Sequence, residues 1–463
     1  MFGGGPVGPS GAKGDKSLSL GLMETFRAAW ADPDLKARIL FVLAMFSVFI
    51  FGIHVPVPIP GVSTDQVAKI IDSNTGLGLI SMFGGGALRR VSIFALSLGP
   101  YMTAQIIMQI LTTAFPQWKK DLQEGGDYAR QVQNKRTRLL TLFLCVFQGA
   151  GLFALIHQYL GPAVAGNTLM MTVSVVLIWT AGAMFVLWLG EQISEKGIGN
   201  GVSLMIFAGI ILSMPYQFDR MRKGVESGNV EIWRPLLMLL ILVATTWVIV
   251  YFTVAQRRIP IQHMRRMVGT KVQGGQTSYL PLSVNMVGVI PIIFASSLLF
   301  IPQQIAMAVG PTSSVGLFLS NVQNWISPAS RQNWGPISLP VNPVGVLAYT
   351  MMIFFFTYFY TAIQYNVEDI ATNLKRGGSF IPGVRPGKQT KDFLDGVISR
   401  ITFVGSFFLA VVALVQYMAP AIVGIDYTYV SYLGGTSLLI VVSVALETLR
   451  QIEANLLMKK YGQ

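Results

Sequence analysis

Apolar residues gather in ten stretches along the chain, each close to the length that crosses the hydrocarbon core of a membrane. A transmembrane helix needs about 20 such residues, and somewhat shorter segments are tolerated. The fifth stretch is the shortest, because it contains Gly209 and ends at Pro215. The pattern predicts an all-α polytopic membrane protein with ten transmembrane helices. The stretches lie at residues 37–53, 92–113, 139–160, 170–190, 202–214, 234–255, 284–309, 344–366, 398–420 and 433–449.

The polar stretches divide the chain into five parts. Near the N-terminus, Leu22, Met23, Phe26 and Trp30 fall near one face of a helix expected from Leu18 to Trp30, which is typical of a helix lying on a membrane surface. A solvated linker is the alternative. The expected parts are a tail with this interfacial helix (1–36), an N-terminal half (37–214), an external loop (215–233), a C-terminal half (234–449) and a second tail (450–463).

The composition excludes a soluble protein. Of the 463 residues, 52% are hydrophobic and only 12% are charged, whereas a soluble domain carries about 25% charged residues. The single cysteine, Cys145, leaves no intramolecular disulfide. The three histidines, His54, His157 and His263, are scattered, which argues against a histidine metal site. We therefore expect neither a metal nor a cofactor.

The charges indicate how the chain lies in the membrane. The net charge is +13, and most Lys and Arg fall in the segments that are cytoplasmic when the N-terminus is inside. This bias predicts that both termini are cytoplasmic. Glu191, Glu368, Glu447 and Arg400 lie at the ends of apolar stretches, so the membrane interior is almost free of charge. That argues against an ion-driven pump, which keeps a charge there for its task.

Glycine and proline mark the second and seventh stretches. Gly99-Pro100 lies early in the second and Gly288 with Pro291 lies early in the seventh, at matching places in the two five-helix halves. We expect a weakened backbone that can kink there. Two such segments of opposite direction are typical of an inverted repeat with a pathway between its halves.

Three further segments do not span. Residues 77–90 are too short to cross, too apolar for a solvated loop and contain three consecutive glycines, so we expect a re-entrant helix followed by a hinge, with an interfacial loop helix as the alternative. The basic segment 256–283 predicts a protruding hairpin that turns at Gly274-Gly275. The segment 367–397 predicts a Gly/Pro-stiffened loop that presents Arg385. Two long, structured basic loops favour docking of a large acidic partner.

Several long strings resemble the SecY family, whose members are channel subunits of the bacterial preprotein translocase. The resemblance runs from about residue 35 to 460. It implies a clamshell of two pseudo-symmetric, inverted five-helix halves, hinged at 215–233, with a pore between them and a re-entrant plug helix at 77–90. The strings are SIFAL (92–96), WLGEQI (188–193), GIGNG (197–201), VIP (289–291), FIPGVRPG (380–387) and GGTSLLI (434–440).

The same resemblance implies roles for particular residues. Related plugs have a more varied sequence, whereas this one carries three glycines and the pair Arg89-Arg90. The implied positions are a pore ring at Leu98, Met102, Val202, Ile206, Ile293 and Ile440; a plug at Met82, Phe83, Gly84, Gly85, Gly86, Ala87 and Leu88; a lateral gate at Gln109, Thr112 and Asn285; and a docking surface at Arg257, Arg258, Arg265, Arg266 and Arg385.

The resemblance also implies partners and a location. These are the small membrane subunits SecE and SecG, the motor ATPase SecA, the ribosome, signal peptides and preprotein chains in the bacterial plasma membrane, while the basic loops suit anionic lipids. The chain would be a channel and not an enzyme, with energy supplied by SecA or by translation. The rivals are an inverted-repeat solute transporter, which needs a compact polar site at the midplane, and a lipid scramblase or membrane scaffold, which needs no structured basic loops.

Overall fold

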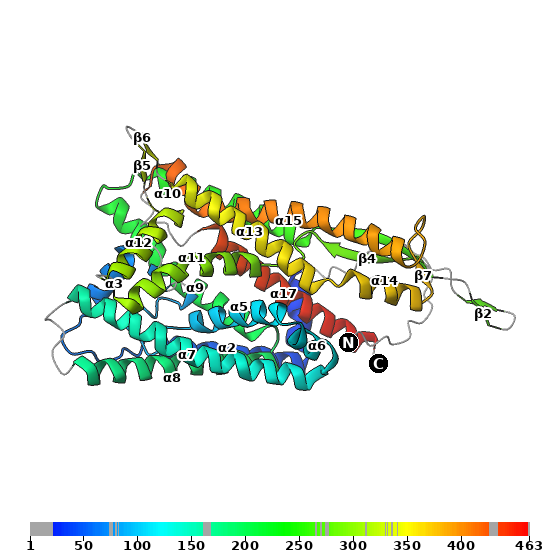
Figure 1. The fold of residues 1–463 in the computed structure, drawn as a ribbon, viewed down its shortest axis with the longest axis horizontal. Coiled ribbons are helices and arrows are strands. Elements are labelled where there is room, and N and C mark those ends of the chain that lie inside the picture. Colours follow the sequence, from blue (N-terminus) through cyan, green and yellow to red (C-terminus); the bar gives the residue numbers. More distant parts are fainter. Residues whose placement is uncertain are drawn as a thin grey trace.

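A long helical bundle makes up most of the computed structural model (Figure 1). Its long helices run along the molecule, and short strands lie at both ends. The structure describes residues 22–73, 77–78, 81, 83–160, 168–263, 266–268, 271–273, 277–310, 313–328, 330, 332–334, 337–339, 341–425 and 434–461.

The elements fall into three groups. The bundle helices are α2 (Pro33–Ile53), α5 (Gly99–Ala114), α7 (Gly126–Leu160), α8 (Thr168–Lys196), α9 (Gly201–Glu226), α10 (Trp233–Val254), α11 (Ile290–Val309), α13 (Pro343–Gln364), α15 (Lys388–Val423) and α17 (Gly435–Tyr461). The shorter helices are α1 (Leu22–Ala31), α3 (Thr64–Ser73), α6 (Pro116–Glu124), α12 (Ser314–Ile326) and α14 (Val367–Arg376). The strands are β1 (Gln256–His263), β2 (Arg266–Val268), β3 (Lys271–Gln273), β4 (Thr277–Ser283), β5 (Gln332–Trp334), β6 (Ile337–Leu339) and β7 (Ser379–Phe380).

Each of the ten apolar stretches overlaps one of the bundle helices. Among the described residues, eight helices are long and apolar enough to cross a membrane: α2, α7, α8, α9, α10, α13, α15 and α17. Helix α5 has 16 residues, and the described apolar part of α11 is Ile290–Ala306. A multi-pass helical membrane protein is therefore confirmed, while the count of ten crossings stays a prediction.

The helices α5 and α11 begin later than expected. Residues 92–98 and 284–289 are not helical, so the expected starts at 92 and 284 are wrong. Ser97 and Gly288 have positive φ, which a right-handed helix cannot include. Pro100 and Pro291 occupy the first turns of their helices, where a missing N–H costs nothing. They set helix starts and make no kink.

Helix α9 continues through Pro215 to Glu226, so most of the external loop expected at 215–233 is helix. Proline removes one hydrogen bond of the helix. Tyr216 and Phe218 beside it are exposed, so the loss occurs where part of the surface of α9 is open. The connection between α9 and α10 is the short segment 227–232.

The two basic segments form one structure. Strands β1 and β4 pair antiparallel from Gln256↔Ser283 to Gln262↔Thr277, which confirms the hairpin. Its outer part is the β2–β3 pair, so the chain reverses between those strands; Gly274-Gly275, the expected turn, lie outside the described residues. Strand β7 from the second segment adds to the other edge of β1 through His263↔Ser379. Both basic loops therefore lie at one end of the bundle (Figure 1).

Close contacts at glycines repeat in the two halves. A Cβ atom on Gly182 of α8 would overlap the Ile93 carbonyl, and one on Gly405 of α15 would approach the Val284 carbonyl. Ile93 and Val284 each lie six residues before the helix that follows, α5 and α11. Likewise the first residues of α9 and α17 are glycines, whose Cβ atoms would overlap carbonyl oxygens of α8 and α15. Matching helices thus pack in matching ways, which supports two related halves.

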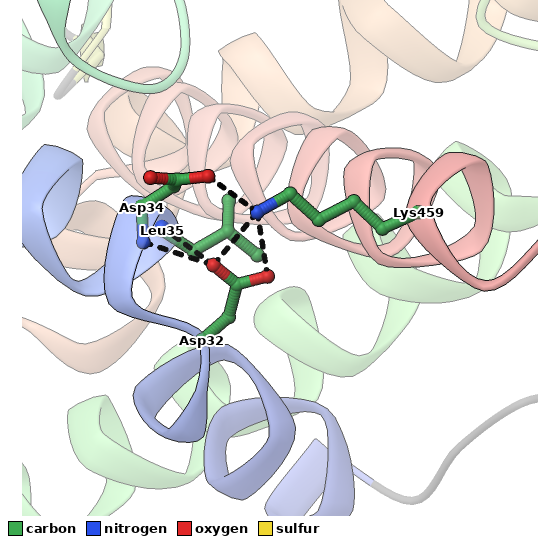
Figure 2. Close-up of polar contacts among 4 residues, drawn as sticks. All are labelled: Asp32, Asp34, Leu35 and Lys459. Carbon is green, nitrogen blue, oxygen red and sulfur yellow. Dashed lines mark hydrogen bonds and ion pairs between the residues drawn. The ribbon is translucent and has the colours of Figure 1, made fainter. Parts of the chain in front are cut away.

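The N- and C-terminal helices are tied together at the end that carries the basic loops. Ala29 of α1 is buried with Leu35, Ile198 and Ile452, while Trp30 is exposed. Figure 2 shows the Lys459 ammonium between two carboxylates, with Nζ 2.9 Å from Asp32 Oδ2 and 2.7 Å from Asp34 Oδ2. Asp32 also caps α2 by accepting from the Asp34 and Leu35 N–H groups. The Lys459 hydrogen bond, supported by these N–H groups, lowers the pKa of Asp32.

The stabilisation that comes from the contact of Lys459 with Asp32 and Asp34 should depend on pH. Lys459→Met should lower the thermal unfolding temperature at neutral pH, and the difference from the wild type should shrink below about pH 4. A carboxyl group whose pKa is lowered by folding stabilises the fold above its ordinary pKa and loses this contribution as the pH falls through the folded pKa. Thermal melts in detergent across this range measure the effect, with the exposed Lys196→Met as the control. A difference that is constant with pH would contradict the assignment.

Candidate functional site: the apolar centre between the halves

The six predicted ring residues come from both halves and belong to one hydrophobic cluster, in which four of them are buried and two, Val202 and Ile293, are partly buried. Four residues separate Leu98 from Met102 and Val202 from Ile206, so each pair lies on one helical face. The N-terminal half contributes Leu98 at the N-cap of α5, Met102 from α5, and Val202 and Ile206 from α9, and the C-terminal half contributes Ile293 and Ile440 from α11 and α17.

The starts of two helices position this cluster. Asn200 caps α9 by accepting a hydrogen bond from the Ser203 N–H at 3.4 Å, and Gly201 packs directly on α8. These two features fix the first turns of α9, which carry Val202 and Ile206. Leu98 occupies the N-cap position of α5, so its position depends on the turn that precedes this helix.

The glycine-rich segment lies against the cluster. Phe83 packs on it and Ala87 belongs to it, whereas Leu88 belongs to the neighbouring cluster around Trp179. The described residues 77, 78, 81 and 83 are helical and residues 84–91 form turns, so the expected helix ends before the glycines and does not extend to residue 90. The reason is the positive φ of Gly85 and Gly86, which ends a helix. Met82 lies outside the described residues.

Arginines hold the end of this segment. The Arg89 guanidinium is buried and lies 4.1 Å from the ring centroid of Tyr216 on α9. Arg90 contacts Nε2 of His54, which follows α2, and Nδ1 of His54 lies 2.8 Å from the Ile50 carbonyl. The contacts tie the segment to two helices of the N-terminal half.

A polar contact closes the boundary between the halves, but not the expected one. Helix α11 packs against α7 and α5, and Gln148 on α7 donates to Gln304 on α11 at 3.3 Å. Thr112 instead accepts a hydrogen bond from Gln133 of α7. The predicted gate residues Gln109 and Asn285 each have a buried polar atom without a hydrogen-bond partner in the described part of the chain.

The two glutamines that bridge α7 and α11 are absent from the sequence-based list. The sequence does contain a signal for both glutamines, because each is a polar residue within an apolar stretch. Their pairing could not be inferred, since 156 positions separate them. A small cavity of about 30 Å³ lies beside this boundary, lined by Phe83, Ser97, Thr103, Ser296 and Gln304 among others. It is roughly the space that one water molecule occupies in the liquid.

The structure places most of the predicted basic surface at one end. Arg257 and Arg258 are exposed on β1, and Arg385 is exposed in the turn after β7. Arg266 begins β2, and Arg265 lies outside the described residues. His263 joins the two loops, because its ring nitrogens lie 2.8 Å from Ser379 Oγ and 3.4 Å from Ser278 Oγ. In the described part of the chain, no three His, Cys, Asp or Glu side chains gather as a metal site would require.

These features define a class: a multi-pass membrane protein of two related halves that share an apolar cluster. The SecY family model matches residues 92–449. The protein translocase subunit SecY of Streptomyces galbus is 38% identical over 454 residues, which cover 95% of this chain and 99% of that protein. The SecY subunit of Aquifex aeolicus is 38% identical over 449 residues, with the same coverage. The chain belongs to the SecY family.

Solved structures agree on the fold. A structure described as a protein-conducting channel matches with a TM-score of 0.62 at 18% identity, covering 91% of this chain and 93% of that one. A SecY structure in which the plug domain stabilises the closed state matches with a TM-score of 0.64, at the same identity and coverage. Sec61 in a canine ribosome–channel complex matches with a TM-score of 0.58 at 16% identity.

Proposed function

We propose that this chain is the protein-conducting channel subunit of a bacterial Sec translocon. The observation that carries the proposal is that six apolar side chains from both halves belong to one hydrophobic cluster. An unfolded polypeptide would pass between the halves through this ring. Membership of the SecY family supports the same function.

The ring chemistry suits a passage that must close and yet not hold its substrate. Apolar side chains that approach one another exclude water and therefore ions. They offer no hydrogen-bond partner, so a passing peptide of any sequence finds no strong binding site. Residues 82–88 would act as the plug and cover the ring in the idle channel, because Phe83 and Ala87 pack in the same cluster as the ring residues.

The boundary between α5/α7 and α11/α13 would be the lateral gate. Separation of α11 from α7 would break the Gln148–Gln304 hydrogen bond, which water can replace. An apolar signal sequence or membrane helix of about 20 residues gains free energy on entering lipid, so it would leave through this opening.

The exposed basic end would dock the partners that supply energy. We propose SecA and the ribosome there, with Arg385 as the central residue and Arg257, Arg258, Arg265 and Arg266 around it. Two solved relatives are bound to ribosomes, in the canine Sec61 and yeast Ssh1 complexes. SecE and SecG would be the membrane partners. Both termini would lie at this basic end on the cytoplasmic side, where anionic lipids of the plasma membrane would face it.

A secondary solute transporter of inverted-repeat design is not favoured. Such a protein binds its substrate at a polar site near the midplane, whereas the central cluster here is apolar. No energy-coupling step is assigned to the chain itself, because the proposed driving force comes from SecA or from translation.

Site-specific photocrosslinking tests the proposed channel. A photoreactive residue at Ile206 or Ile293 should crosslink to a stalled secretory chain in membranes, because both belong to the ring. The control is Val243, which is 60% exposed on α10 and faces away from the cluster. An absence of crosslinks from both ring positions in correctly inserted protein would favour the transporter alternative.

A further inference from the structure

Gly209 on α9 touches the backbone of the plug. A Cβ atom at this position would overlap the Phe83 carbonyl oxygen and lie 3.0 Å from its carbonyl carbon and 3.2 Å from the Gly85 nitrogen. From the other side, a Cβ on Gly85 would lie 3.5 Å from the Gly209 Cα. Two backbones therefore meet here with no side chain between them.

The position of Gly209 relates this contact to the ring. Ile206 lies three residues earlier on α9, so Gly209 is less than one helical turn away on a neighbouring face. Phe83, whose carbonyl meets Gly209, packs its ring on the cluster that contains Ile206. The closeness of α9 to residues 83–85 thus fixes how far the plug reaches toward the constriction.

Comparison of the two halves distinguishes Gly209 from the other glycines that make close contacts. The contacts of Gly182, Gly201, Gly405 and Gly435 occur in matching pairs in the two halves. Gly209 has no glycine partner in that pattern, because the residue at the same distance from the start of α17 is Ser443. The plug belongs to the N-terminal half alone, so an unmatched glycine fits a contact with the plug.

We propose that Gly209 is the seat of the plug: the missing side chain at this position sets the resting place of residues 83–85 and therefore the tightness of the idle channel. This inference rests on the proposed function. Glycine inside a helix lowers helix stability relative to alanine, so its presence needs another reason. A carbonyl group of the main chain cannot rotate away as a flexible side chain can, so even one methyl group should displace the plug.

Gly209→Ala tests the seat in the full translocase. Reconstituted into planar bilayers, the variant should show a severalfold higher resting ion conductance than the wild type. Gly396→Ala is the matched control, because it lies within α15 and a Cβ there meets no heavy atom within 4 Å. The control should leave the conductance unchanged. Wild-type conductance in Gly209→Ala would overturn the proposal.

A disulfide reports the position of the plug directly. A Cβ built on Gly85 lies 3.5 Å from Leu212 Cβ, within the separation that a disulfide accepts. A cysteine at Gly85 is itself strained, because φ is positive there and its Cβ would lie 2.9 Å from Ile53 Cδ1, so the cysteine pair without Gly209→Ala is the reference. In a Cys145→Ser background, this Gly85→Cys/Leu212→Cys pair should oxidise in the idle channel, and adding Gly209→Ala should lower the yield severalfold. An unchanged yield would overturn the proposal.

Deletion of residues 81–86 separates an effect on the plug from one on the ring. In the deleted chain, Gly209→Ala should add no further conductance, since the seat has lost its occupant. If Gly209→Ala impairs insertion of the full chain, the deletion should restore insertion. The proposal would be overturned if the deletion did not restore insertion, or if Gly209→Ala raised the conductance of the deleted chain as well as that of the full chain. Crosslinking from Ile206 to a stalled chain is an independent readout, so loss of crosslinks with an intact conductance effect would reject the channel function and not the seat.

Discussion

Arg385→Glu should abolish protein export while the chain still folds and inserts. The Arg385 side chain is exposed in the turn between β7 and α15. Its backbone carbonyl, and not its guanidinium, serves the fold by accepting a hydrogen bond from Thr390 Oγ1 at 2.9 Å. Reversing the charge therefore leaves the local structure in place and changes only what the surface presents to a partner.

The expected loss comes from the docking step. A glutamate in place of an arginine that faces an acidic group replaces attraction with repulsion, and truncation of such a pair alone weakens binding by about thirtyfold or more. Translocation of a secretory precursor into membrane vesicles measures export, and SecA and ribosome binding to the same vesicles measure docking. Arg130→Glu is the control, since it makes the same charge change at an exposed arginine of α7. Normal export by Arg385→Glu would refute the docking assignment.

The sequence predicts the framework well because hydrophobic length is a strong signal. Each apolar stretch overlaps a helix, and the basic hairpin from Gln256 to Ser283 forms as expected. The six ring residues are different: Ile206 looks like any core isoleucine, and only the family resemblance selects it. The structure brings all six into one cluster, although their role in conduction stays a proposal.

The misses share a physical cause, which is that tertiary contacts override local signals. Positive φ at Ser97, a residue with no special freedom, delays the start of α5. The pairing of β7 with β1 joins segments more than 100 residues apart, so neither segment alone predicts it. Gly209 is the plainest case, since the stretch that contains it looks broken by this glycine, whereas the helix continues and the glycine meets the backbone of residues 83–85.

Ile206→Asn should open the closed constriction to water and ions. Ile206 is 5% exposed and packs with the other ring residues. An asparagine there carries an amide that needs hydrogen bonds, and a buried amide without partners costs about 1–3 kcal/mol. The side chain can avoid this cost by admitting water, which ends the dewetting that seals an apolar ring.

Single-channel recordings of the idle translocase measure this effect. The variant should show resting currents that the wild type lacks. The control is Ile211→Asn, because Ile211 also lies on α9 but is 41% exposed and outside the cluster. Hydration of the ring and loss of the plug seat are distinguishable, since deletion of residues 81–86 should leave the Ile206→Asn leak in place but remove any effect of Gly209→Ala. Unchanged conductance in Ile206→Asn would place the constriction elsewhere.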